Sequence, residues 1–314
     1  MKKTIYILII LTLCNSFAFG QDPQFTQGYA IPLYLAPSFA GTTAGSRVSL
    51  AFRDQWPAAT KLTGDREYVT YAAAYDHYFP TSNSGLGVIF MQDNAGMGAL
   101  TSTSIGVQYS YNFLATRKLQ IRPALEFSYH SKSINISKLT FGDQLSFYGN
   151  RPTSLEGVML ENFNYTDFAA SVLFYHVEFW AGFSVNNLAQ SNQSITADKS
   201  ILPTRLTVFG GKKIITKGRR GSRDEESVTL SFLYKSQAKF DQLDIGFYWS
   251  HKPLVLGIWY RGLPFIKSYQ NYINNDAINL LVGYAIDEFT IGYSYDFTIS
   301  RLISTSGGAH EVTL

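Results

Sequence analysis

An alternation of apolar and polar residues recurs along almost the whole chain, and this feature most constrains its fold. Successive side chains of a strand point to opposite faces, so a period of two predicts β-structure. We recognise thirteen such segments and the beginning of a fourteenth. They are built on residues 47–53, 69–76, 86–90, 102–111, 119–130, 168–174, 177–185, 206–210, 228–234, 243–249, 254–260, 278–284, 289–295 and 310–314.

The two faces of these strands distinguish between a soluble β-sandwich and an outer-membrane barrel. The outward face of a soluble sandwich would be rich in Lys, Glu and Asp. Here one face is apolar, and the other is mostly Ser, Thr, Ala, Gly and Gln. Charged residues make up 16% of the chain and aromatic residues 15%. An apolar outer face with a small, polar inner face is typical of a membrane barrel.

The predicted connections alternate in length, as they do in outer-membrane barrels with a periplasmic N-terminus. An even strand number is also usual, so the sequence predicts about 14 antiparallel strands over residues 46–314. Several odd-numbered connections are long (57–66, 131–163, 187–202, 262–276, 298–309), and three even ones are short (175–176, 250–253, 286–288). The charged stretch 215–226 is a long even connection. It is either a solvated hairpin tip or a docking point for a periplasmic partner.

Residues 1–20 have the pattern of a signal peptide: two lysines, an apolar run and small residues before the expected cleavage near Gly20. Leu11–Cys14 resembles a lipobox, but the bulky Leu13 disfavours that reading. Cys14 is the only cysteine, so no disulfide framework is expected in the mature chain.

Residues 21–45 form a proline-containing, apolar segment between the signal peptide and the first strand. Pro23, Pro32 and Pro37 favour an extended or turning backbone, and the density of apolar side chains requires burial. We expect this segment to pack inside the barrel as a plug, with Phe25, Tyr34 and Phe39 buried. Arg47 and Arg53 should then hydrogen-bond its carbonyl groups or carboxylates such as Asp22.

The longest connection, 131–163, is the main candidate for a binding loop, because loops of this length are usually functional or disordered. We expect it to fold over or into one mouth of the barrel, with the N-terminal segment on the other side.

The sequence offers no pattern for catalysis or for metal or cofactor binding. The five histidines are scattered, and no nucleophile motif or phosphate loop occurs. Arg122 and Glu126 share a strand face and are expected to form a lumenal ion pair. The net charge of +3 is too small to indicate nucleic acid. We therefore expect a non-enzymatic protein with no cofactor and no nucleic-acid partner.

Several motifs in order resemble the PorP/SprF family of type IX secretion and gliding proteins of Bacteroidetes-type bacteria. They are Asp22-Pro23-x-Phe25-Thr26-Gln27, Pro32-Leu33-Tyr34-Leu35, Ala40-Gly41, Arg53-x-Gln55-Trp56, Leu139-Thr140-Phe141-Gly142-Asp143-Gln144 and Gly307-Gly308-Ala309-His310-Glu311. The chain departs from the family pattern at Ala36, Ser38 and Asn187, where the resemblance leads us to expect Asn, Ala and His.

The resemblance implies an outer-membrane barrel that works with type IX secretion components. It also implies a partner, an exported surface protein bound or anchored through its C-terminal sorting domain. By resemblance, Gln27 and Trp56 join the candidate lumen contacts, and Phe141, Asp143 and Gln144 are candidate loop contacts. The alternatives are an outer-membrane channel for small solutes and, less favoured, a soluble secreted β-protein.

Overall fold

The structure is a computed structural model that describes residues 22–58, 68–96, 100–135, 144–146, 149–150, 162–194, 200–222, 224–267, 273–300 and 306–314. The predicted signal peptide with Cys14 lies outside these residues. Among the candidate loop contacts, Phe141 and Asp143 also lie outside them.

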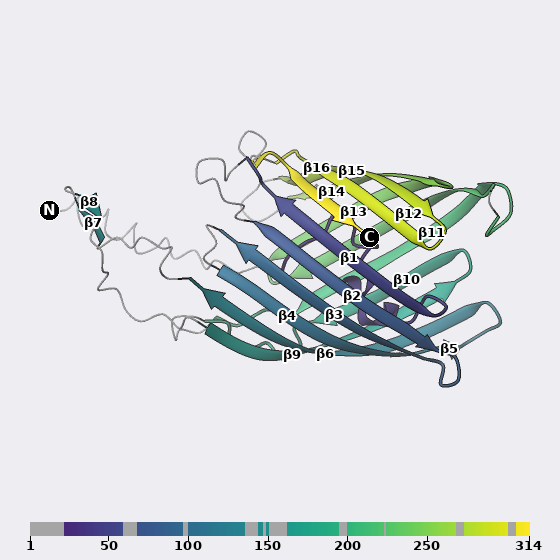
Figure 1. Ribbon diagram of the computed structural model, residues 1–314, viewed down its shortest axis with the longest axis horizontal. Helices are drawn as coiled ribbons and strands as arrows, with labels where there is room; N and C mark the ends of the chain where they lie inside the picture. Colours follow the sequence, from purple (N-terminus) through teal and green to yellow (C-terminus); the bar gives the residue numbers. More distant parts are fainter. Residues whose placement is uncertain are drawn as a thin grey trace.

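A closed antiparallel barrel of fourteen strands forms the molecule, which confirms the predicted fold (Figure 1). Each strand pairs with its neighbour in sequence, and the last pairs with the first. The barrel strands are β1 (Ser46–Gln55), β2 (Val69–Phe79), β3 (Ser84–Ala95), β4 (Leu100–Tyr111), β6 (Leu119–Ile134), β9 (Asn162–His176), β10 (Phe179–Asn186), β11 (Arg205–Lys217), β12 (Glu226–Gln237), β13 (Phe240–His251), β14 (Leu254–Lys267), β15 (Ile273–Ile286), β16 (Phe289–Thr298) and β17 (Ala309–Thr313).

Three further strands are two residues long: β5 (Phe113–Leu114), β7 (Leu145–Ser146) and β8 (Gly149–Asn150). β5 pairs with β6 at the rim of the barrel. β7 and β8 pair only with each other and lie apart from the barrel in Figure 1. The described part of connection 135–161 therefore does not fold over the mouth, in contrast to the prediction.

The short strand β17 closes the barrel. Its residues Ala309–Thr313 pair with Gln55–Ala51 of β1 on one side and with Asp296–Gly292 of β16 on the other. Leu50 and Leu314 continue the ladder by exchanging two backbone hydrogen bonds of 2.8 and 2.9 Å. Strand β17, although only five residues long, therefore joins β1 to β16 and closes the sheet.

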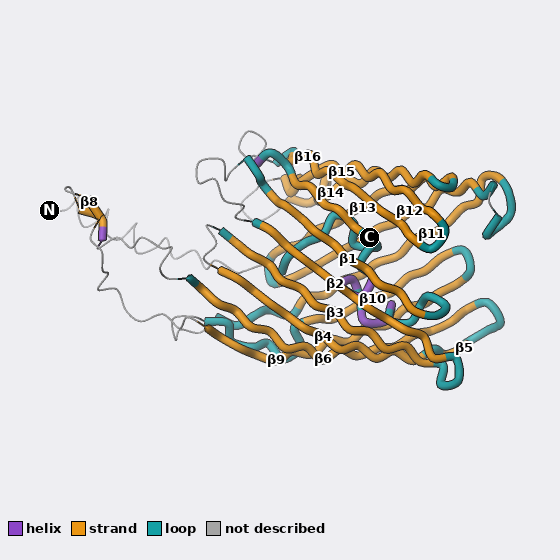
Figure 2. Tube along the Cα trace, in the orientation of Figure 1, coloured by secondary structure: helices purple, strands orange, loops and turns teal. Residues whose placement is uncertain are grey.

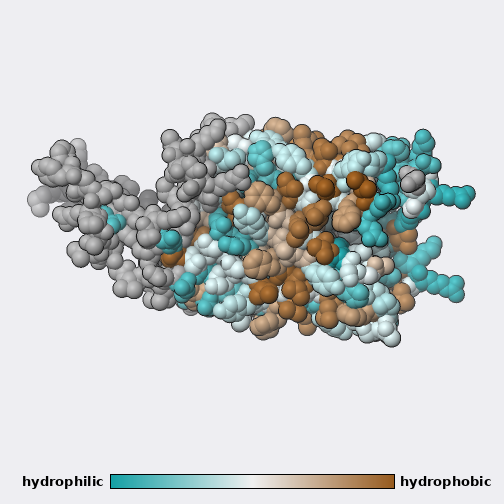
Figure 3. Space-filling view, in the orientation of Figure 1, coloured by the Kyte–Doolittle hydropathy of each residue, from teal (hydrophilic) through white to brown (hydrophobic). Residues whose placement is uncertain are grey.

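Apolar side chains face outward and polar ones face inward. In β6, Leu125 is 66% exposed and Phe127 48% exposed, whereas the alternate residues Arg122, Ala124 and Ser128 are buried inside. Figure 3 shows apolar residues gathered around the middle of the barrel, with polar residues toward the end on the right. This band is what lipid requires of a barrel surface.

The connections divide into a long-connection end and a short-connection end. The long-connection end carries the four longest connections (56–68, 135–161, 187–204 and 299–308) together with 96–99, 238–239 and 268–272, and the short-connection end carries 80–83, 112–118, 177–178, 218–225, 252–253 and 287–288. Two predicted connections are shorter than expected, because β11 continues to Lys217, β12 begins at Glu226 and β14 continues to Lys267. Register shifts at Ile215/Lys217 and Arg261/Gly262 break the alternation while the ladder continues, which hides these strand ends in the sequence.

Before β1, the chain makes two short helical turns, α2 (Pro32–Leu35) and η1 (Pro37–Phe39), drawn within the barrel in Figure 2. The prediction of an extended or turning backbone therefore did not foresee helical turns at these residues. Proline is compatible with the first turn of a helix, where its missing N–H has no partner to lose. Within the described residues, no helix is long and apolar enough to span a membrane.

Candidate functional site

Residues 22–41 run along the lumen from the long-connection end to the short-connection end. The carboxylate of Asp22 accepts hydrogen bonds from Arg205 Nη1 at 2.7 Å and from Asn187 Nδ2 at 3.2 Å, beside connection 187–204. At the other end, the Gly41 N–H donates to Asp76 Oδ2 at 2.7 Å, close to the turn 80–83. Each end of the segment is therefore fixed to the wall by a carboxylate.

A buried carboxylate on β17, the strand that pairs with β1 to close the barrel, binds the start of this segment. Glu311 of β17, with no exposed surface, accepts the consecutive backbone N–H groups of Thr26 at 2.7 Å and Gln27 at 2.8 Å. The Thr26 hydroxyl donates to Asp296 of β16 at 2.7 Å. Gln27 is further held by Ser294 and Thr313. Thus the last two strands bind the segment through both backbone and side chains.

Arg53 of β1 completes this anchor. Its guanidinium lies 2.9 Å from Asp296 and 3.2 Å from Glu311, and it also donates to the Thr26 hydroxyl. Arg261 of β14 extends the network through Asp244 at 3.4 Å and Asp296 at 3.3 Å. The buried charges on these strands are therefore paired with opposite charges, as burial in a lumen demands.

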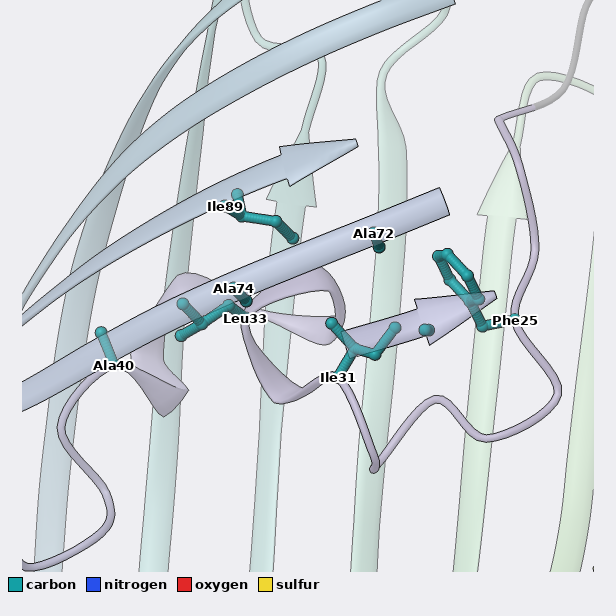
Figure 4. Close-up of a cluster of buried hydrophobic side chains, with 8 residues drawn as sticks. Phe25, Ile31, Leu33, Ala40, Ala72, Ala74 and Ile89 are labelled. Atoms are coloured by element: carbon teal, nitrogen blue, oxygen red, sulfur yellow. The ribbon is translucent and has the colours of Figure 1, made fainter. Parts of the chain in front are cut away.

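The apolar side chains of the segment fill the lumen on two sides. Phe25, Ile31 and Leu33 pack against small inward residues of β1 and β2 and against Ile89 of β3 (Figure 4). Leu35 and Ala36 form a second cluster with Leu173, Phe209 and Leu233. The small alanines of β1 and β2 leave room for this packing.

Polar contacts fix the second half of the segment. The carbonyl of Ala40 accepts hydrogen bonds from Ser110 at 2.7 Å and Arg122 at 2.8 Å. Gln108 donates to the Leu33 carbonyl at 2.9 Å and also donates to Glu126. The predicted ion pair between Arg122 and Glu126 is therefore replaced by contacts of Arg122 with the segment and of Glu126 with Gln108.

The candidate lumen residues occupy the following positions. Phe25 and Tyr34 stack edge to face, with ring centroids 5.1 Å apart, and Phe39 lies against Phe209 at 5.3 Å. Arg47 donates to the Phe39 carbonyl at 3.0 Å and binds Asp76, so it contacts the segment. Asp22 pairs with Arg205 and not, as predicted, with Arg47 or Arg53, whose partners are Asp76, Asp296 and Glu311.

A cavity of about 540 Å³ opens at the long-connection end. Its wall includes Asp22, Pro23 and Gln24 of the segment and Trp56, whose ring packs against Tyr68. The remaining wall is highly polar, with Arg53, Arg205, Lys235, Arg261, Asp93, Asp241, Asp276 and Asp296 among its residues. The candidate loop residue Gln144 is described, but it is not part of this cavity wall.

The charged connection 218–225, at the short-connection end, is held by contacts among its own residues and with Lys213 of β11. Glu225 accepts a hydrogen bond from the Gly221 N–H and forms an ion pair with Lys213 at 2.5 Å. The hydrogen bond from Lys213 lowers the pKa of Glu225, so this carboxylate is ionised at neutral pH. The exposed positions of Lys217, Arg219 and Arg220 fit the solvated-hairpin interpretation of this connection.

Sequence reasoning missed Glu311, Asp296, Arg205 and Arg261, which hold the segment and the cavity. Each is a charged residue at an inward position of its strand, and it contacts a residue of the segment that lies far away in sequence. Thr26 and Glu311, for example, are 285 residues apart. Charged residues at inward positions of the alternation are the signal that could have identified them. Among the described residues, no cluster of His, Cys, Asp and Glu could hold a metal ion.

The chain is similar to several solved barrel structures at very low sequence identity. The toluene transporter TbuX of Ralstonia pickettii is 12% identical, with a TM-score of 0.48 over 90% of each chain. Omp33 of Acinetobacter baumannii is 8% identical, with a TM-score of 0.46 over 85% of this chain and 94% of that one. The toluene transporter TodX of Pseudomonas putida is 10% identical, with a TM-score of 0.46 over 94% and 93%. No curated protein sequence matches the chain.

The closed barrel with an apolar outer band defines the class: this is an outer-membrane β-barrel protein. Residues 17–314 match the family described as type IX secretion system membrane protein PorP/SprF. The chain therefore belongs to the PorP/SprF family, is a barrel component of the type IX secretion system and resides in the outer membrane.

Proposed function

We propose that this protein recognises exported surface proteins at its long-connection mouth and anchors them in the outer membrane through their C-terminal domains. The observation that carries the proposal is the cavity of about 540 Å³ at that mouth, behind which residues 25–41 are bonded to the wall. A ligand in this cavity meets a polar wall and, beyond it, a packed segment. This arrangement suits binding at the rim better than passage through the lumen.

In this proposal, residues 21–45 act as the plug and residues 46–314 as the lipid-embedded anchor. Partners are outer-membrane lipid, other secretion components and the exported protein. No catalytic step is required, since holding a cargo protein needs only a binding surface. The alternative, a channel for small solutes, requires the lumen to conduct with the segment in place.

Cargo binding is tested by affinity capture of the tagged protein from detergent-solubilised outer membranes, followed by mass spectrometry. The expected result is recovery of a surface protein whose capture is lost when its C-terminal domain is deleted. Ser300→Trp should abolish capture, because Ser300 lines the cavity. Ser222→Trp in connection 218–225 is the matched control and should retain it. Equal capture by both variants would place cargo binding elsewhere.

The channel alternative is tested with the purified protein in planar bilayers. We expect no large steady conductance from the full-length protein. A large open conductance would rule out the plug and favour transport of small solutes.

A further inference from the structure

The N-terminal segment begins at the end of the barrel opposite to the one where β1 begins. Ser46 opens β1 at the short-connection end, where the Gly45 carbonyl accepts a hydrogen bond from Tyr78 N–H at 3.0 Å. Asp22 lies at the long-connection end, bonded to Arg205 and Asn187. The chain therefore crosses the lumen once from Asp22 to Gly41, turns at residues 42–45, and returns through the wall as β1.

Three further observations support this direction of the segment, from the long-connection end to the short-connection end. Pro23 and Gln24 share the mouth cavity with Trp56 and Thr298, which lie at the long-connection ends of β1 and β16. The Tyr34 hydroxyl donates to the Pro23 carbonyl and ties this mouth to α2. At the opposite end, the Ala40 carbonyl is held by Ser110, next to the turn 112–118.

Long connections face the cell exterior in outer-membrane barrels, and short turns face the periplasm. We propose that residues 22–24 are displayed at the cell-surface mouth of the barrel, where they form part of the cavity wall. A molecule that approaches from outside therefore meets the beginning of the N-terminal segment first. The ion pair between Asp22 and Arg205 acts as the latch that keeps residues 22–24 at the rim.

Single-cysteine labelling of intact cells tests this display, because Cys14 is the only native cysteine and precedes the expected cleavage near Gly20. The test variant is Gln24→Cys. Ala189→Cys reports the long-connection end, whereas Ala44→Cys and Ser222→Cys report the short-connection end; Ala44 and Ala189 are exposed and Ser222 is partly exposed. The probe is a membrane-impermeant biotin maleimide, applied before and after permeabilisation. Heat-modifiable migration on SDS gels verifies that each variant is folded.

We expect Gln24→Cys and Ala189→Cys to be labelled in intact cells, and the other two only after permeabilisation. Adding Asp22→Asn to Gln24→Cys should raise the labelling rate about two- to fivefold, because a partly exposed ion pair is lost. The proposal is overturned if Gln24→Cys is labelled only after permeabilisation, or in neither state. It is also overturned if Ala189→Cys needs permeabilisation, because the long connections would then face the periplasm.

Discussion

At the scale of single residues, the carboxylate of Glu311 links three parts of the chain. It accepts two backbone N–H groups from the N-terminal segment and pairs with Arg53 of β1, while its own strand pairs with β1 and β16. Segment binding and barrel closure therefore depend on one buried side chain.

Replacing this carboxylate should weaken the barrel seam. Glu311→Gln removes the charge that pairs with Arg53 and one of the two strong acceptors. Arg53 keeps Asp296 as a partner, so we expect a loss of about 1.5–3 kcal/mol in the free energy of unfolding, the range for hydrogen bonds to charged groups. Urea unfolding in lipid vesicles measures this change. Glu288→Gln in the exposed turn 287–288 is the control and should change stability little; an equal loss in both variants would contradict the role of Glu311.

At the scale of elements, the N-terminal segment depends on close approach between its backbone and β3. A Cβ atom added at Gly85 would lie 2.3 Å from the Ala40 carbonyl oxygen, far inside van der Waals contact. Gly28 lies within the segment itself, where an added Cβ would meet only Leu233, at 3.7 Å. Glycine is therefore required sterically at Gly85 but not at Gly28.

These two glycines give a matched test of segment docking. Gly85→Ala should displace η1 and the turn after it, at a cost of about 1–3 kcal/mol, as overpacking usually does. Gly28→Ala should be tolerated. Limited proteolysis of the purified protein measures the difference as cleavage within residues 22–45. If both variants resist protease like the unmodified protein, the segment is not held by its contact with β3.

At the scale of the whole molecule, the lipid-facing band sets where charge is tolerated. Ile105 faces outward from the middle of β4 and is 47% exposed, and Val177 is equally exposed, at 49%, but lies in the turn 177–178. Burial alone does not distinguish the two positions. The two positions differ in their surroundings, because Ile105 faces lipid and Val177 faces water.

Lysine at these two sites should therefore have different costs. Ile105→Lys should destabilise the protein folded in a bilayer by about 2–4 kcal/mol, and Val177→Lys should destabilise it by about 0–1 kcal/mol. Folding into vesicles at increasing urea concentration measures both. A soluble β-protein would show similar small effects at the two sites, so equal costs would contradict the membrane assignment.

The strand count, the outward apolar face and the difference between the two ends could be read from the sequence. All three follow from local alternation and from the spacing between strands, which are fixed by residues close together in the chain. The burial of Phe25 and the partial burial of Tyr34 and Phe39 could also be anticipated, because a proline-containing segment with this many apolar side chains needs a cavity to enclose it.

The direction of that segment and the residues that bind it were decided only by the tertiary structure. Glu311, Asp296, Arg205 and Arg261 lie on strands far from residues 22–27 in sequence, and only barrel closure brings them together. The pairing of Asp22 with Arg205, not with Arg53, depends on which end of the lumen Asp22 reaches. Alternation assigns a side chain to the inner face of the wall. Its partner across the lumen is determined by the curvature and register of the closed sheet.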